Sequence, residues 1–150
     1  MKSFYKTIDS VIHYIDNHDR FLILSNLDIV YIHLSEHSQV IVLDVSNNHI
    51  KELSLECNHL EMLICKNNNI DYLNINSKVL YSLICYENNI DYFKISWQTI
   101  RNIMADKSLF KDAPKDSILK VTERDGDIEI LNLYGKNLEM IKNYITFEEQ

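Results

Sequence analysis

The sequence is poor in the residues that build nucleotide-binding loops. Its 150 residues include two glycines and one proline, and alanine is nearly absent. Because Gly126 and Gly135 are the only glycines, the chain has no glycine-rich turn that could cradle a phosphate. Isoleucine, asparagine and tyrosine are abundant instead, a bias typical of an AT-rich genome such as that of a virus, phage or symbiont.

The chain also lacks a basic cluster and a long apolar run. Its formal net charge is -7, whereas a phosphate-backbone partner requires clustered lysine and arginine. No stretch reaches the roughly 18 apolar residues of a membrane helix. The first nineteen residues contain Asp9 and no uninterrupted apolar region, so we expect no secretory signal. We therefore predict a cytoplasmic protein with no nucleic-acid partner and no membrane partner.

Cysteine is scarce, and the three cysteines cannot all pair. No two of them have zinc-finger spacing. Cys65 and Cys85 stand twenty residues apart, and we expect them to be buried, reduced thiols in a cytosolic protein. A disulfide between Cys65 and Cys85 on neighbouring strands is the alternative.

Residues that could support catalysis or metal binding are equally sparse. His33 and His37 are four residues apart, a spacing that brings two ligands together only along a helix, and this segment has strand-like sequence. Cys85 near a histidine could form a nucleophile in principle, but an apolar environment makes a thiol unreactive. We therefore predict no metal site, no cofactor, no catalytic residues and no enzymatic activity.

What the chain does contain is a repeat of twenty residues between positions 40 and 95. Its rows are VIVLDVSNNHIKELSLECNH, LEMLICKNNNIDYLNINSKV and LYSLICYENNIDYFKI. Seven columns coincide, and chance rarely aligns more than one or two. The columns are Val40/Leu60/Leu80, Leu43/Leu63/Leu83, Val45/Cys65/Cys85, Asn48/Asn68/Asn88, Ile50/Ile70/Ile90, Leu53/Leu73/Phe93 and Leu55/Ile75/Ile95.

The pattern L-x-x-L-x-L-x-x-N-x-I-x-x-L-x-L resembles the leucine-rich repeat family. The resemblance implies an α/β solenoid: a right-handed coil of about five to six turns, with one short strand per repeat in a parallel concave sheet. The residues predict the same strand without the family, because Leu63 and Cys65 alternate with the polar or outward positions between them. One repeat cannot bury its apolar face alone, whereas stacked repeats cover one another.

The asparagine column is expected to be structural. The resemblance implies that Asn48, Asn68 and Asn88 form a buried ladder, each amide bonding loop backbone of its own repeat and of the next. Some such partner is required, because a buried amide without one costs about 1–3 kcal/mol. The asparagines beside them, such as Asn47 and Asn67, are expected to be solvated.

The flanks of the repeats are expected to close the stack of a single domain, residues 1–150. Phe4, Ile8, Val11, Ile12 and Ile15 recur at helical spacing, so we predict an N-terminal helical cap over 1–19. Such a cap would cover the open end of the solenoid. A membrane-surface helix is the competing interpretation, although it would need a basic face.

The repeats are predicted to occupy 20–113, beginning with a degenerate row over 19–39. Leu22, Leu24, Ile29, Ile32 and Leu34 fill the repeat columns of that row if its closing turn has one extra residue, and Leu27 stands where the asparagine should be.

The segment beyond the regular rows allows two interpretations at each step. Residues 96–117 predict either another repeat strand at 101–106, which we favour, or a helix capped by Ser96. Residues 118–133 predict either a hairpin around Arg124-Asp125-Gly126 or one more repeat. Residues 137–147 have helical spacing, and we expect 114–150 to form a C-terminal cap.

The outward strand residues are the predicted binding site, because the resemblance implies that this face of the sheet binds partners. The set combines apolar and aromatic residues, which are typical of interface cores, with a few charges that would set orientation. Further charges at Glu61, Glu87 and Asp106 would form its rim. The predicted partner-binding residues are Phe21, Ile23, Val42, Asp44, Met62, Ile64, Lys66, Tyr81, Ile84, Tyr86 and Met104.

The predicted function is the binding of another protein on this concave face. The resemblance extends to microbial and viral repeat proteins that engage host factors, so an inhibitor or effector of a host factor is the more specific hypothesis. Two alternatives stay open: a homodimer that buries the apolar face, and an acidic mimic of nucleic acid. A terminal segment folded across the sheet would also cover the face. Tyr31, Tyr72 and Tyr92 form a separate column, expected to stack on the outer wall.

Overall fold

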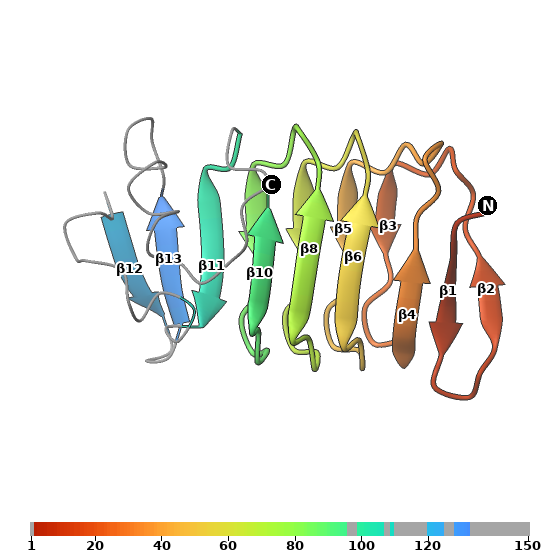
Figure 1. The fold of residues 1–150 in the computed structure, drawn as a ribbon, viewed down its shortest axis with the longest axis horizontal. Coiled ribbons are helices and arrows are strands. Elements are labelled where there is room, and N and C mark those ends of the chain that lie inside the picture. Colours follow the sequence, from red (N-terminus) through yellow and green to blue (C-terminus); the bar gives the residue numbers. More distant parts are fainter. Residues whose placement is uncertain (1, 96–98, 107–108, 110–119, 125–127, 133–150) are drawn as a thin grey trace.

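The chain folds as a β-solenoid of about four turns with a period of about twenty residues (Figure 1). The computed structural model describes residues 2–95, 99–106, 109, 120–124 and 128–132. Each turn contributes one strand to each of two layers, which lie face to face. The prediction of stacked twenty-residue repeats is confirmed.

The first sheet has seven strands in the order β12-β13-β11-β9-β7-β5-β3. Neighbouring strands from β3 to β11 run parallel, and the last two pairs are antiparallel. Their bounds are β3 Phe21–Ile23, β5 Val42–Asp44, β7 Met62–Ile64, β9 Ser82–Ile84, β11 Asn102–Asp106, β12 Lys120–Arg124 and β13 Ile128–Asn132.

The register of the first sheet follows the sequence repeat. Leu43 pairs with Leu63, and Leu63 pairs with Leu83, as parallel neighbours. All three side chains are fully buried between the layers. The apolar columns therefore stack into one continuous core, because each repeat covers the apolar face of its neighbour.

The second sheet contradicts the predicted α/β class, because the opposite side of each turn is also a strand. Its strands are β6 Glu52–Glu56, β8 Tyr72–Asn76 and β10 Tyr92–Ile95, all parallel. In β6, Leu53 and Leu55 are buried while Ser54 is exposed, which is the period of two that a half-buried strand requires. A helix would require a period of 3.6, and these segments do not have it. The described residues contain no helix that could span a membrane.

The predicted N-terminal helical cap is also wrong, because the segment is a β-hairpin. Strands β1 Phe4–Thr7 and β2 Ile12–Tyr14 pair with each other and, through β1, with β4 Ile29–His33. This N-terminal sheet has the order β2-β1-β4. Ser10 turns the hairpin with φ 69°. Strand β1 hydrogen-bonds to the exposed backbone edge of β4, which a helix cannot do.

The predictions for the segments that follow the regular rows have different outcomes. Strand β11 confirms the repeat strand at 101–106, since it runs parallel to β9. Strands β12 and β13 pair antiparallel, which is the hairpin alternative rather than one more repeat. The predicted helical tail over 137–147 and the other residues of 133–150 lie outside the described residues.

Candidate functional site

The predicted binding residues share the outward face of the first sheet. Strand pairing aligns Asp44 with Ile64, Ile64 with Ile84, and Ile84 with Met104 across four neighbouring strands. Ile23 is the partner of Asp44 at the N-terminal edge. The adjacent row consists of Phe21, Val42, Met62, Ser82 and Asn102, aligned in the same way.

Exposure is unequal across this face. Phe21 and Ile23 on the edge strand are 67% and 63% exposed, whereas Ile64 and Ile84 in the middle are half-buried. Flanking strands on both sides explain the difference, because each outward side chain packs against its two neighbours. Ser82 is buried at 8% exposure, and Tyr81 beside it is 44% exposed. The face is therefore largely apolar, although Asp44, Ser82 and Asn102 interrupt it, and it is most open at β3.

The charges of the face are already engaged in part. Lys66 Nζ donates to Tyr86 Oη at 3.1 Å and lies 5.4 Å from the centroid of that ring. The carboxylate of Asp44 accepts from the backbone and hydroxyl of Ser46 at 2.9 and 2.6 Å. The Asp106 carboxylate accepts the backbone N–H groups of Glu87 and Asn88 in the preceding turn. The two aspartates thus hold turns in place, whereas Lys66 and Tyr86 form one pre-arranged polar pair on the apolar surface.

The asparagine column bridges neighbouring turns, but towards the preceding repeat rather than the next. Asn68 Nδ2 donates to Cys65 O in its own repeat and to Val45 O in the preceding one, at 3.1 and 3.0 Å. Its Oδ1 accepts Ile50 N–H at 3.0 Å. Asn88 repeats these bonds twenty residues later, although it is half-buried rather than buried.

The residue before each ladder asparagine has a left-handed backbone, and so does Asn26, which precedes Leu27 in the same column. Asn26, Asn47, Asn67 and Glu87 have φ of 59°, 56°, 53° and 57°. Asparagine tolerates this conformation better than most residues. Asn67 Nδ2 also donates to Asn47 Oδ1 at 2.7 Å. These asparagines, expected only to be solvated, therefore shape the turns.

The cysteines are buried and free. Burial raises the pKa of the Cys65 and Cys85 thiols far above the ordinary value of 9.0. Cys57 is also buried, its pKa is raised by desolvation, and its thiol donates to Val40 O at 3.5 Å. A protonated, desolvated thiol is a poor nucleophile and a poor metal ligand.

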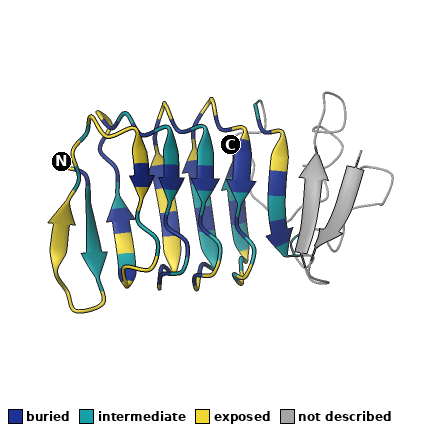
Figure 2. Ribbon diagram, turned by 180° about the vertical axis from the view of Figure 1, so that it is seen from behind, coloured by how far each residue is buried: buried dark blue, intermediate teal, exposed yellow. Residues whose placement is uncertain are grey.

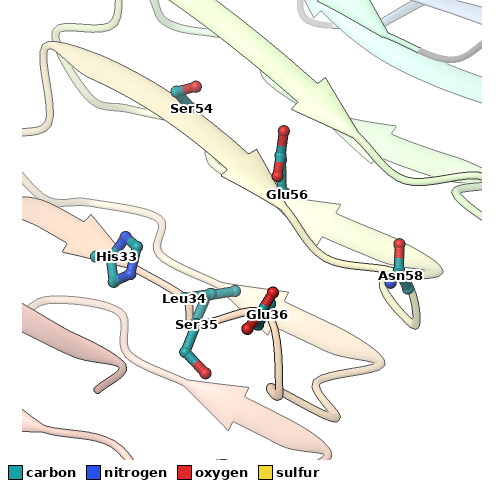
Figure 3. Close-up of a pocket in the computed structure, with 7 residues that line it drawn as sticks. All are labelled: His33, Leu34, Ser35, Glu36, Ser54, Glu56 and Asn58. Atoms are coloured by element: carbon teal, nitrogen blue, oxygen red, sulfur yellow. The ribbon is translucent and has the colours of Figure 1, made fainter. Parts of the chain in front are cut away.

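A crevice opens where β4 diverges from β6 (Figure 3). The two strands belong to separate sheets, and the turn before β6 bonds to the start of β4, from His49 N to Ile29 O at 2.8 Å. The crevice has a volume of 550 Å³. It is lined by His33, Leu34, Ser35, Glu36, Ser54, Glu56 and Asn58.

The crevice does not assemble catalytic chemistry. Among the described residues, no hydrogen bond joins His33 to Ser54 or to either glutamate, although a nucleophile needs a base within hydrogen-bond reach. His33 Nε2 is buried and has no partner in the described part of the chain. Glu36 lies 3.5 Å from His37 and is otherwise exposed. No group of three metal-ligating side chains occurs in the described ranges.

The tyrosine column is divided between two contacts. Tyr72 and Tyr92 stack on neighbouring strands with ring centroids 4.4 Å apart and planes 7° apart. Tyr31 does not join this stack, because the register partner of Tyr72 on the neighbouring strand β6 is Glu52. The ring of Tyr31 instead lies beside the ring of Phe4, with their centroids 5.8 Å apart.

Sequence reasoning missed the exposed apolar side chains of the N-terminal hairpin. The described residues include ten exposed large hydrophobic residues, and eight of them precede position 32, among them the predicted binding residues Phe21 and Ile23. The predicted helix places Ile8, Val11 and Ile12 on a buried face, whereas the hairpin exposes all three. The eight residues are Ile8, Val11, Ile12, Tyr14, Phe21, Ile23, Leu27 and Tyr31.

Comparisons with protein families, with curated proteins and with solved structures gave no match for this chain.

Proposed function

We propose that this chain is a non-enzymatic module that binds another protein on the outward face of its first sheet. The observation that carries the proposal is the aligned apolar row of Ile64, Ile84 and Met104 beside Val42 and Met62. Contiguous apolar surface, unlike isolated apolar residues, is typical of an interaction site.

The rigidity of the sheet supports the proposal. Strands β5, β7 and β9 are held on both sides by parallel pairing, and the asparagine ladder fixes the following turn. A partner would therefore dock without ordering a loop, which lowers the entropic cost of binding. Lys66 and Tyr86 would supply a cation and a phenol hydroxyl at the border of the apolar surface, just beyond the ends of β7 and β9, a combination suited to orienting a partner.

The proposal also includes a repeat family, a location and a class of partner for this module. The rows match the leucine-rich repeat pattern at every apolar position of the first strand, so we propose a variant of that repeat in which the second side is also a strand. The proposed location is cytoplasmic, in keeping with three reduced cysteines. A partner from a host cell is the more specific form of the hypothesis.

The experiment is the double substitution Ile64→Asp with Ile84→Asp. Both side chains are half-buried on the face, so two carboxylates should abolish docking while the thermal midpoint falls by only a few degrees. The matched control is Ser54→Asp, which adds a carboxylate to an exposed strand position on the opposite sheet. Quantitative affinity capture from candidate host lysates should identify proteins retained by the wild type and the control but lost by the double variant. Equal retention by all three chains would contradict the proposal.

A homodimer is the second candidate, because the same apolar face could bury itself against a second copy. Sedimentation equilibrium at micromolar concentration separates the two. A chain that is monomeric at all concentrations would contradict the homodimer hypothesis. A dimer that is abolished by Ile64→Asp would support the homodimer in place of the proposed binding of another protein.

A further inference from the structure

Strand β3 presents an unpaired backbone edge. In its parallel ladder with β5, Leu24 N donates to Asp44 O at 2.7 Å, so even-numbered residues of β3 face β5. Successive residues of a strand point their N–H and C=O groups to opposite sides. The groups of Phe21 and Ile23 therefore point away from the sheet, and no described residue bonds to them.

The N-terminal hairpin extends past this edge and forms a ledge. The order β2-β1-β4 places two strands beyond β4, and both views show them without a first-sheet strand opposite (Figures 1 and 2). At about 4.8 Å per strand, the ledge is about 10 Å wide.

The floor of the ledge is aromatic. Tyr5 pairs with Ile32, which is buried, so the side chain of Tyr5 faces inward. His13 is its partner on the other side, and the two rings stack with centroids 4.7 Å apart and planes 13° apart. The unpaired edge of β3 thus lies next to the stacked rings of Tyr5 and His13, which a further strand would cover.

We propose that this ledge binds an extended peptide segment of a partner protein, which adds to β3 as one more strand of the first sheet. The peptide backbone would pair with the N–H and C=O groups of Phe21 and Ile23. Its side chains would alternate: one set packs on Tyr5 and Leu22, and the other lies beside the exposed Phe21 and Ile23 side chains. The ligand class is therefore a short strand with apolar residues on both faces.

The geometry favours a peptide over a second copy of the chain. Two copies could pair their β3 edges only antiparallel, about a twofold axis perpendicular to the joined sheet. That axis keeps both hairpins on the same side, where each extends across the partner's β3. The hairpins would then occupy the same space, whereas a single peptide strand fits beneath one hairpin.

This site lies at the end of the solenoid and does not rest on the proposed function. The face centred on Ile64 and Ile84 could bind a folded partner whether or not the ledge binds a strand. Substitutions in β3 therefore test the ledge separately.

The probe is a displayed library of random ten-residue peptides, selected on the full chain. The decisive variant is Ile23→Pro, because proline removes the outward N–H without removing a bond to β5. The control variant Ile23→Val keeps that N–H. We expect selected peptides to bind the proline variant at least about tenfold more weakly and the valine variant about equally.

Chemical variants of the peptide keep the test independent of protein folding. N-methylation of one alternate set of backbone nitrogens should abolish binding, whereas N-methylation of the other set should leave it unchanged, because a strand pairs along one edge. In hydrogen exchange, the amides of Phe21 and Ile23 should be unprotected in the free chain and protected with peptide.

Several results would overturn the proposal. These are a library with no enriched peptide, binding that is equal on the proline variant, and methylation effects without alternation. Protection of both amides in the free chain would show that the chain covers its own edge. A dimer that is lost on Ile23→Pro would place a second copy there instead.

Discussion

The side-chain oxygen of Asn68 accepts the backbone N–H of Ile50, eighteen residues earlier, at 3.0 Å. The same amide donates to carbonyls on both sides of the boundary between repeats, including Val45 O and Cys65 O. One buried side chain therefore satisfies backbone groups of two turns that have no strand partner. This contact makes the turns of the solenoid interdependent.

Replacement of Asn68 by alanine should destabilise the chain by about 1–3 kcal/mol, because the buried Ile50 N–H loses its side-chain acceptor. Val45 O and Cys65 O also each lose one of their two asparagine donors. Urea unfolding followed by circular dichroism measures the change. The control is Asn69→Ala, an exposed neighbour, which should change stability by less than about 0.5 kcal/mol. Similar effects of the two substitutions would show that the ladder contributes little.

Each ladder asparagine bonds to the preceding repeat, which explains why the first row can lack its asparagine. Leu27 occupies that position and is 40% exposed, while Asn48 of the following row accepts Leu27 N–H and donates to Leu24 O. An asparagine at 27 would find no described row before it to bond. Leu27→Asn should therefore change the free energy of unfolding by no more than about 0.5 kcal/mol. A gain of more than about 1 kcal/mol in urea unfolding would show that an asparagine there finds partners.

The sequence predicts the stacking of the turns well because a period of twenty repeats in seven columns. Leu43, Leu63 and Leu83 are parallel neighbours, as the columns require. The alternation of Leu53 and Leu55 contains the signal for the second sheet, whereas the α/β class is what the family resemblance implies. Local periodicity is the better guide there, since a strand pattern of period two cannot form one apolar helix face.

The N-terminal cap could not be predicted from spacing alone. Ile8 and Ile12 fit a helix face, yet they are 62% and 50% exposed in the hairpin. What selects the hairpin is the backbone edge of β4, a tertiary requirement that no local pattern contains. The placement of the predicted binding face follows from register, whereas its uneven exposure depends on where the sheet ends.

Glu87 is the one glutamate in a column of left-handed asparagines. Its φ is 57°, and a side chain longer than asparagine gains no local compensation there. Glu87→Asn should stabilise the chain by about 0.5–1 kcal/mol, measured as a rise in the urea midpoint at unchanged slope. Glu87→Gln removes the charge but keeps the strain, so it should give little change. An equal gain from glutamine would assign the effect to charge.

The buried thiols predict a loss of stability at alkaline pH. Burial raises the pKa of Cys65 and Cys85 above the ordinary value of 9.0, so above pH 9 the unfolded chain releases protons that the folded chain retains. The unfolded state then gains about 1.4 kcal/mol per thiol at pH 10, and full stability is present below pH 9. The comparison is the double variant Cys65→Val with Cys85→Val, because Val45 occupies the same buried column in the first regular row.

Urea unfolding at pH 7 and pH 10 should show the effect as a difference between these two proteins. Between the two pH values the wild type should lose about 3 kcal/mol more than the valine variant, since two thiols contribute and every other titrating group is shared. Cys57 is present in both proteins, so its contribution cancels in the difference between them. Equal losses would mean that the Cys65 and Cys85 thiols ionise as readily in the folded chain as in the unfolded one, which a core that excludes water from that column does not allow.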